Sequence, residues 1–94
     1  MELSELMETL TALAGEAGLK VREVRAGADG EPPIASGVCW LRGEIWVLLV
    51  AADGLERRVD VIAGALKTHA GAILEGRYLP PAVRERLSRE PEVG

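Results

Sequence analysis

Residues 37–50 of the chain read GVCWLRGEIWVLLV, which is the strongest structural signal in the sequence. The stretch divides at Arg42 and Gly43 into two runs of β-branched, aromatic and aliphatic residues, which is typical of a β-hairpin. Each face of this hairpin would be apolar, whereas a sheet with one solvent-facing side alternates apolar with polar residues. We therefore expect both faces to be covered, by helices or by another copy of the chain.

The pairing of the two strands depends on the length of their turn. A two-residue turn at Arg42-Gly43 places Cys39 opposite Trp46, whereas a three-residue turn places Trp40 there. Arginine at the first of two turn positions would need a positive φ angle, which is unfavourable for it. The sequence thus slightly favours the longer turn, with Gly43 in the left-handed conformation.

Two amphipathic segments precede the hairpin. Residues 3–17 repeat apolar side chains every three or four positions, which predicts a helix. Gly18 is the expected end of that helix. Residues 19–25 are highly charged and alternate only in part, as is typical of an edge strand whose charges discourage further pairing.

Two further helices are expected after the hairpin. Residues 54–70 carry one apolar stripe, and Asp53 and Glu56 have the spacing of a capping box at its start. Pro81 suits the first turn of a last helix over residues 81–89.

These elements together predict a single α+β domain over residues 1–94, since a chain of 94 residues forms one core. Its sheet is expected to be a short three-stranded antiparallel one, made of the hairpin and the strand at 19–25. The Gly- and Pro-rich residues 26–36 are expected to form a mobile connector, and residues 90–94 a frayed tail.

The composition indicates a cytoplasmic protein with no membrane segment. The chain is 48% hydrophobic and 28% charged, and its longest apolar run, residues 45–52, spans eight residues. A membrane-spanning helix needs about 20. Three glutamates occupy the N-terminal segment where a signal peptide would carry basic residues, and a single cysteine agrees with a reducing compartment.

The charged residues argue against nucleic-acid binding. The net charge is −4, and residues 1–50 hold eight acidic groups against four basic ones, so no basic face for phosphate is expected. The chain lacks Asn, Gln and Phe and has nine Arg against two Lys, a thermophile-like composition.

Cys39 and His69 are the only weak candidates for chemistry, as a thiol and its base. A reactive thiol needs a nearby cation, a helix N-terminus or a paired histidine, and none is local to Cys39, which we expect to be a buried packing residue. For His69 we expect a half-buried ring bonded to a backbone carbonyl. The sequence thus predicts no catalytic residues, no metal site and no cofactor.

Small-molecule binding is an alternative. The aromatic side chains of Trp40, Trp46 and Tyr78 could stack on a ligand, with Arg42 or Arg77 as partners for an anionic group. Tryptophans in such strands are more often part of the core.

The order of elements is similar to the core of zincin metallopeptidases, in which the helix after the sheet carries an HExxH motif. Here VDVIAGALKTHA, residues 59–70, occupies that helix. The three functional positions of the motif fall on Gly64, Ala65 and Thr68, or, shifted by one residue, on Ala65, Leu66 and His69. At most one metal ligand is present and the glutamate is absent, so this resemblance implies a degenerate scaffold without its catalyst.

The chain also resembles small uncharacterised bacterial proteins built as a helix, a hairpin of the GGxCRxxG type, an apolar helix and an ending like YLPPAVRE. This similarity covers about residues 36–88. It rests on Gly37, Cys39 and the turn at 42–43, and more closely on residues 78–85. It implies no activity.

The function that these observations favour is a non-enzymatic interaction module that associates with itself, as a homodimer, or with another protein. A hairpin that is apolar on both faces, together with three amphipathic helices, is much apolar surface for a small domain to bury alone.

Overall fold

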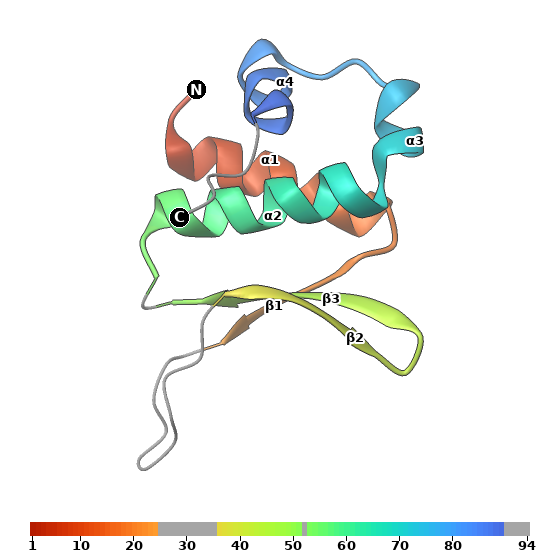
Figure 1. The fold of residues 1–94 in the computed structure, drawn as a ribbon. Helices are drawn as coiled ribbons and strands as arrows, with labels where there is room; N and C mark the ends of the chain where they lie inside the picture. Colours follow the sequence, from red (N-terminus) through yellow and green to blue (C-terminus); the bar gives the residue numbers. More distant parts are fainter. Residues whose placement is uncertain (25–35, 52, 90–94) are drawn as a thin grey trace.

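The computed structural model describes residues 1–24, 36–51 and 53–89, and these form an α+β fold, as the sequence predicts (Figure 1). The elements in chain order are α1 (Leu3–Glu16), β1 (Lys20–Val24), β2 (Gly37–Leu41), β3 (Glu44–Val50), α2 (Leu55–His69), α3 (Gly71–Glu75) and α4 (Pro81–Ser88). Residues 26–35 of the connector predicted over 26–36 and the predicted tail at 90–94 lie outside the described residues, whereas the last residue of that connector, Ser36, is buried.

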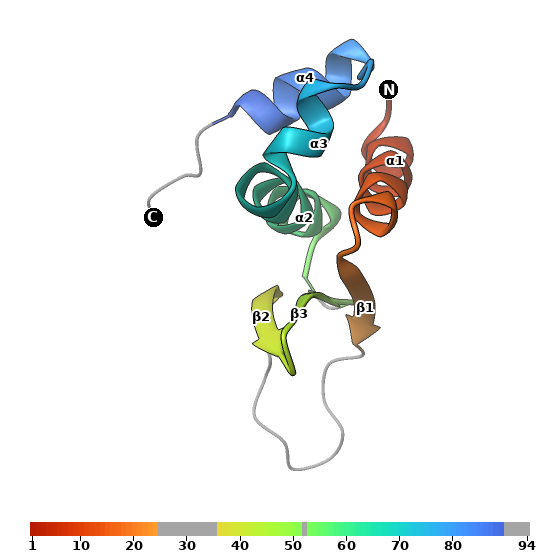
Figure 2. The same ribbon diagram turned by 90° about the vertical axis from the view of Figure 1, so that its right-hand side faces the viewer.

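The described elements form three layers (Figures 1 and 2). The sheet is the lowest layer, α1 and α2 lie side by side over one of its faces, and α4 lies across the other side of these two helices. The core lies between the sheet and the helix pair and continues between these helices and α4, where Val83 is buried. Its fully buried side chains include Leu10, Val47, Leu49, Ile62 and Leu66.

The end of α1 is fixed by Gly18, as its sequence predicts. Gly18 has a φ angle of 85°, and its N–H donates to Gly15 O at 3.1 Å, while Leu19 N–H donates to Ala14 O at 2.9 Å. This is a Schellman motif, in which glycine takes the left-handed conformation and the next residue covers the last helical turn. Leu19 is accordingly buried and leads directly into β1.

The sheet is mixed, and the prediction of a fully antiparallel sheet is wrong. The strand order is β1-β3-β2, with β2 antiparallel and β1 parallel to β3. The apolar β3 takes the central place, where it can be paired on both sides, and the charged β1 forms an edge, as predicted. Because Val24 pairs with Val50 and Gly37 with Leu48, β1 ends and β2 begins at the same end of the sheet, on either side of β3.

The hairpin closes with the two-residue turn, so the slight preference for a longer turn is wrong. Cys39 lies opposite Trp46, and the pair Leu41–Glu44 closes the hairpin. Arg42 and Gly43 have φ angles of 52° and 80°, as in a type I′ turn, whose twist matches that of the strands. The strand pairing therefore outweighs the cost of a left-handed arginine, about 1–2 kcal/mol.

The helices after the hairpin differ in detail from their predicted form. Gly54 rather than Asp53 is the N-cap of α2, and it makes no side-chain capping bond. The apolar link after α2 contains the short helix α3. Pro81 opens α4 as predicted. None of the helices in the described ranges is long and apolar enough to cross a membrane.

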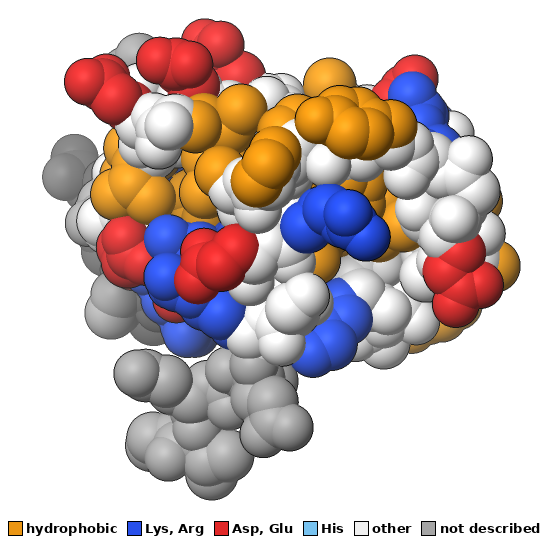
Figure 3. Space-filling model, turned by 90° about the horizontal axis from the view of Figure 1, so that it is seen from above, with side chains coloured by type: hydrophobic (Ala, Val, Ile, Leu, Met, Phe, Trp, Pro, Cys, Tyr) orange, Lys and Arg blue, Asp and Glu red, His pale blue; other side chains and the backbone are white. Residues whose placement is uncertain are grey.

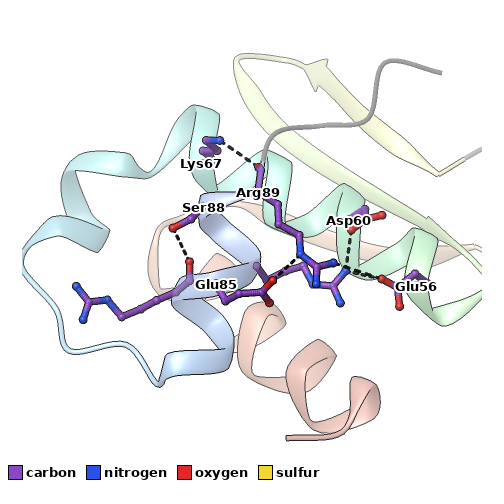
Figure 4. Close-up of polar contacts among 8 residues, drawn as sticks. Glu56, Asp60, Lys67, Glu85, Ser88 and Arg89 are labelled. Carbon is purple, nitrogen blue, oxygen red and sulfur yellow. Dashed lines mark hydrogen bonds and ion pairs between the residues drawn. The ribbon is translucent and has the colours of Figure 1, made fainter.

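Arg86 of α4 forms ion pairs with Glu56 and Asp60 of α2, both of which are labelled in Figure 4. Its side chain is 8% exposed, and Nη1 donates to Glu56 Oε1 at 2.5 Å and to Asp60 Oδ1 at 3.0 Å. The hydrogen bond to Glu56 is the main cause that raises the pKa of Arg86 above its ordinary value. Arg89 joins this ionic cluster through Glu56, whose Oε1 lies 3.9 Å from Arg89 Nη1, and also pairs with Glu85 at 2.8 Å. A charged residue is thus buried at the contact between α2 and α4, with carboxylates as partners.

Candidate interaction surface along β2

The two faces of the sheet differ in their cover. Residues paired across neighbouring strands point to the same face, and Val47 and Leu49 are buried on the face toward α1 and α2. Cys39, Trp46 and Leu48 point to the opposite face and are half-buried. No helix in the described part of the chain lies over that second face (Figure 2). Of the two covers expected for this face, a helix is absent from the described residues, and a second copy of the chain stays a prediction.

Exposed apolar side chains are concentrated on β2. Val38, Trp40 and Leu41 have 41%, 66% and 53% of their surface exposed. The other exposed large hydrophobic residues of the described chain are Met1, Ile73 and Tyr78, which stand on three separate segments. Three large apolar side chains on one strand of five residues form the most concentrated exposed apolar group. We call the outer edge of β2 with these side chains the β2 surface.

The two edges of the sheet have opposite character. The edge strand β1 reads KVREV and carries charges at Lys20, Arg22 and Glu23, which oppose the addition of another strand. The edge strand β2 reads GVCWL and carries no charge and no proline. Only β2 is thus an edge without protection against pairing.

The backbone of β2 presents hydrogen-bonding groups to this open edge. Ala51 N–H donates to Val24 O at 2.9 Å, so odd-numbered residues of β3 direct their backbone groups to β1 and even-numbered ones to β2. Since Cys39 pairs with Trp46, its backbone groups point toward β3. The N–H and C=O groups of Val38 and Trp40 therefore point outward.

The beginning of β2 is held by Ser36 and Asp53. Asp53 Oδ2 accepts from Ser36 Oγ at 2.6 Å and from Ser36 N–H at 3.0 Å, while Ser36 Oγ accepts from Val50 N–H at 2.8 Å. The bonds from the Ser36 hydroxyl and backbone hold the pKa of the Asp53 carboxyl below its ordinary value of 3.8. Asp53 thus bonds to Ser36 instead of capping α2, and fixes the end of the β2 surface.

The structure separates the two candidates for thiol chemistry. His69 is exposed at the end of α2, not half-buried as predicted, and its ring lies edge-on to Trp40 with the centroids 6.0 Å apart. Trp40 points to the helix side of β2, so its neighbour Cys39 points to the other side. Cys39 is half-buried rather than part of the core. The thiol and the imidazole therefore lie on opposite faces of the sheet.

The aromatic and basic candidates for ligand binding are also dispersed. Trp40 and Trp46 point to opposite faces of the hairpin. Tyr78 is 83% exposed in the connection between α3 and α4, and Arg77 pairs with Glu16 at 2.9 Å. Arg42 stands alone at the hairpin turn. None of these five side chains lines the hollow between α2, α3 and α4.

The helical side of the molecule carries a hollow between α2, α3 and α4. Figure 3 shows apolar side chains gathered over the middle of this side, beside a group of acidic and basic side chains. The hollow, of about 240 Å³, is lined in part by Leu74, Leu79, Lys67 and Arg84. Within residues 1–24, 36–51 and 53–89, no three His, Cys, Asp or Glu side chains are placed to hold a metal ion.

Sequence reasoning found the hairpin but missed the part that Val38, Leu41, Ser36 and Asp53 have in this surface. The available signal was the absence of charge from residues 36–41, in contrast to the charged strand at 19–25.

No family model matches the chain, and no curated protein and no solved structure matches it significantly.

Proposed function

We propose that this chain is a non-enzymatic interaction module that associates with itself through the β2 surface. The observation that carries the proposal is the exposure of Val38, Trp40 and Leu41 on an edge strand without charge. An edge of this kind is a template for pairing with another chain.

The energetics of the β2 surface support association. Complete burial of a large apolar side chain contributes about 1.5–3 kcal/mol, and these three residues are between two-fifths and two-thirds exposed. An added strand would also pair the outward backbone groups of Val38 and Trp40. A small domain with such a strand gains both apolar burial and hydrogen bonds by oligomerising.

The positions of the other candidate residues favour this proposal over a catalytic one. Cys39 and His69 do not form a thiol–imidazole pair, because His69 lies on the helix side of the sheet and the Cys39 side chain points to the opposite face. Trp40 is in contact with His69 at the sheet edge rather than in an enclosed pocket, where a small ligand would be surrounded.

Sedimentation equilibrium tests the proposal. We expect the wild-type chain to be a dimer at concentrations of tens of micromolar, and Val38→Lys to shift the equilibrium to monomer because it places a charge on the edge. Ile73→Lys is the matched control, since Ile73 is 47% exposed on α3, and it should leave the dimer intact. A wild-type monomer at all these concentrations, or equal effects of the two variants, would refute the proposal.

A further inference from the structure

We infer that the partner at this surface is a second copy whose β2 pairs antiparallel with the first, about a two-fold axis at Cys39. This inference rests on the proposed function and adds the register of the contact. It predicts one continuous six-stranded sheet with the helices of both copies on the same side.

The backbone of β2 is complementary to itself in this register. Pairing Cys39 with Cys39 places Val38 opposite Trp40 of the other copy, and Gly37 opposite its Leu41. Val38 and Trp40 are the residues whose N–H and C=O groups point outward, so each such pair can exchange two hydrogen bonds. The register pairs all five residues of β2, whereas a shift by one residue in either direction leaves some of them unpaired.

The side chains fit the same register. On the helix side, the large Trp40 would lie against the smaller Val38, an aromatic and β-branched pair of the kind that stabilises neighbouring strands. On the other side, Leu41 would lie opposite Gly37, where an added Cβ would meet nothing within 4 Å. The space over Gly37 can therefore accept Leu41 of the other copy, and both exposed leucines become covered.

Residues of opposite charge come close together at both ends of the paired β2 strands. In this register Arg42 of one copy follows Leu41 and comes opposite Ser36 of the other copy, whose N–H and Oγ hold the Asp53 carboxylate. Arg42 makes no ion pair with any described residue of its own chain. A guanidinium of one copy thus approaches a carboxylate of the other, and the two-fold axis makes this contact twice.

The free side of α2 lies over the same edge. The helix α1 packs against α2 and stands above β1, and β2 is the strand farthest from β1 (Figure 2). The side of α2 that faces away from α1 therefore lies toward β2. Val61, Gly64 and Thr68 share this side by their spacing of three and four. Gly64 and Thr68 are exposed, and nothing lies within 4 Å of a Cβ built on Gly64. The two α2 helices could therefore lie side by side above the joined strands.

Disulfide trapping tests the register, because Cys39 is the only cysteine of the chain. Directly opposed residues of this kind have their Cα atoms about 4.5 Å apart, which is within the range of about 4.4–6.8 Å for a disulfide. With diamide as oxidant, two thiols form one S–S bond, and their two electrons and two protons reduce diamide to its hydrazine. We expect most of the chain to become a covalent dimer on non-reducing gels.

The matched control moves the cysteine within the same strand. In the variant Cys39→Ser/Leu41→Cys, the new thiol is on a more exposed position, but the two Cα atoms of residue 41 would lie about 14 Å apart, four residues along the strands. We expect little covalent dimer from this variant, although sedimentation should show association as in the Cys39→Ser chain.

Each outcome separates the register from the proposed function. Efficient trapping at Cys39 and little at position 41 supports the register. Trapping at position 41 but not at Cys39, in a chain whose association depends on Val38, overturns the register and leaves the proposed function standing. Absence of association by sedimentation overturns both.

Discussion

Asp53 accepts two hydrogen bonds from Ser36, one from Oγ at 2.6 Å and one from N–H at 3.0 Å. The contact joins the beginning of β2 to the segment that leads into α2. The same Ser36 hydroxyl oxygen accepts from Val50 N–H at 2.8 Å, so one buried side chain connects the beginning of β2 to both the end of β3 and the segment that follows it.

Replacement of Ser36 should destabilise the fold. Ser36→Ala leaves the buried Val50 N–H without its acceptor, and an unsatisfied buried group costs about 1–3 kcal/mol. We expect the free energy of unfolding, measured by urea titration at fixed protein concentration, to fall by this amount. Ser88→Ala is the matched control, because the Ser88 hydroxyl bonds only to Arg84 O on an exposed helix face. Its effect should stay within about 0.5 kcal/mol, and equal losses would contradict the role of Ser36.

The Ser36–Asp53 contact should also produce a pH dependence. Since the pKa of Asp53 in the folded chain lies below its ordinary value of 3.8, the unfolded chain takes up the proton first as the pH falls. The contribution of the carboxylate is thus fully present above about pH 3.8 and is lost as the pH falls through the folded pKa. We expect the stability difference between wild type and Ser36→Ala to narrow from pH 6 to pH 2 in urea titrations. A constant difference over this range would contradict the role of the charged Asp53.

The direction of β1 is a feature that the sequence pattern could not predict. The alternation in KVREV predicts a strand and its charges predict an edge, and both are confirmed. A period of two is the same in a parallel and an antiparallel strand, so nothing local to residues 20–24 indicates the direction. The parallel pairing of β1 with β3 depends on where α1 ends relative to β3. That position is set by the tertiary structure and not by the local sequence.

The hairpin turn and the start of α2 were mispredicted for a related reason. The φ preference of Arg42 and the capping-box spacing of Asp53 and Glu56 are local tendencies of about 1–2 kcal/mol each. Strand pairing overrides the first and the contact with Ser36 overrides the second. Apolar patterning did identify the hairpin. The exposure of Val38 and Leu41 depends on which side of β3 each strand occupies, and residues 37–50 alone do not determine that strand order.

Arg86 contributes to stability through its aliphatic stem as well as its charge. Its side chain is 8% exposed, while Glu56 and Asp60 are 57% and 53% exposed, and Nε has no partner among the described residues. The carboxylates can return to water when the guanidinium is removed. Arg86→Ala should therefore cost about 1–3 kcal/mol, mainly through lost packing. Arg86→Met retains an unbranched chain and should cost less than about 1 kcal/mol.

Arg89→Ala is the comparison for the Arg86 variants, because Arg89 is 50% exposed, pairs with Glu85 at 2.8 Å and lies 3.9 Å from Glu56 of α2. Exposed pairs four residues apart contribute about 0.3–0.5 kcal/mol. The comparison is made by urea titration of all three variants. If Arg86→Met were as destabilising as Arg86→Ala, the ionic cluster rather than the packing would stabilise the contact of α4 with α2.

Two glycines at the end of α1 should respond in opposite directions to alanine. Nothing lies within 4 Å of a Cβ added to Gly15 or Gly18, so neither substitution meets a steric obstacle. Gly15 lies within the helix, where alanine is favoured by about 0.5–1 kcal/mol. Gly18 has a φ angle of 85°, where a Cβ costs about 1 kcal/mol or more. Thermal unfolding at fixed concentration should therefore show a higher Tm for Gly15→Ala and a lower Tm for Gly18→Ala, each by several degrees, since 1 kcal/mol corresponds to about 4–8 °C at this size. A Gly18→Ala chain as stable as the wild type would contradict the left-handed conformation at the end of α1, and a loss of stability in Gly15→Ala would contradict the placing of Gly15 inside the helix.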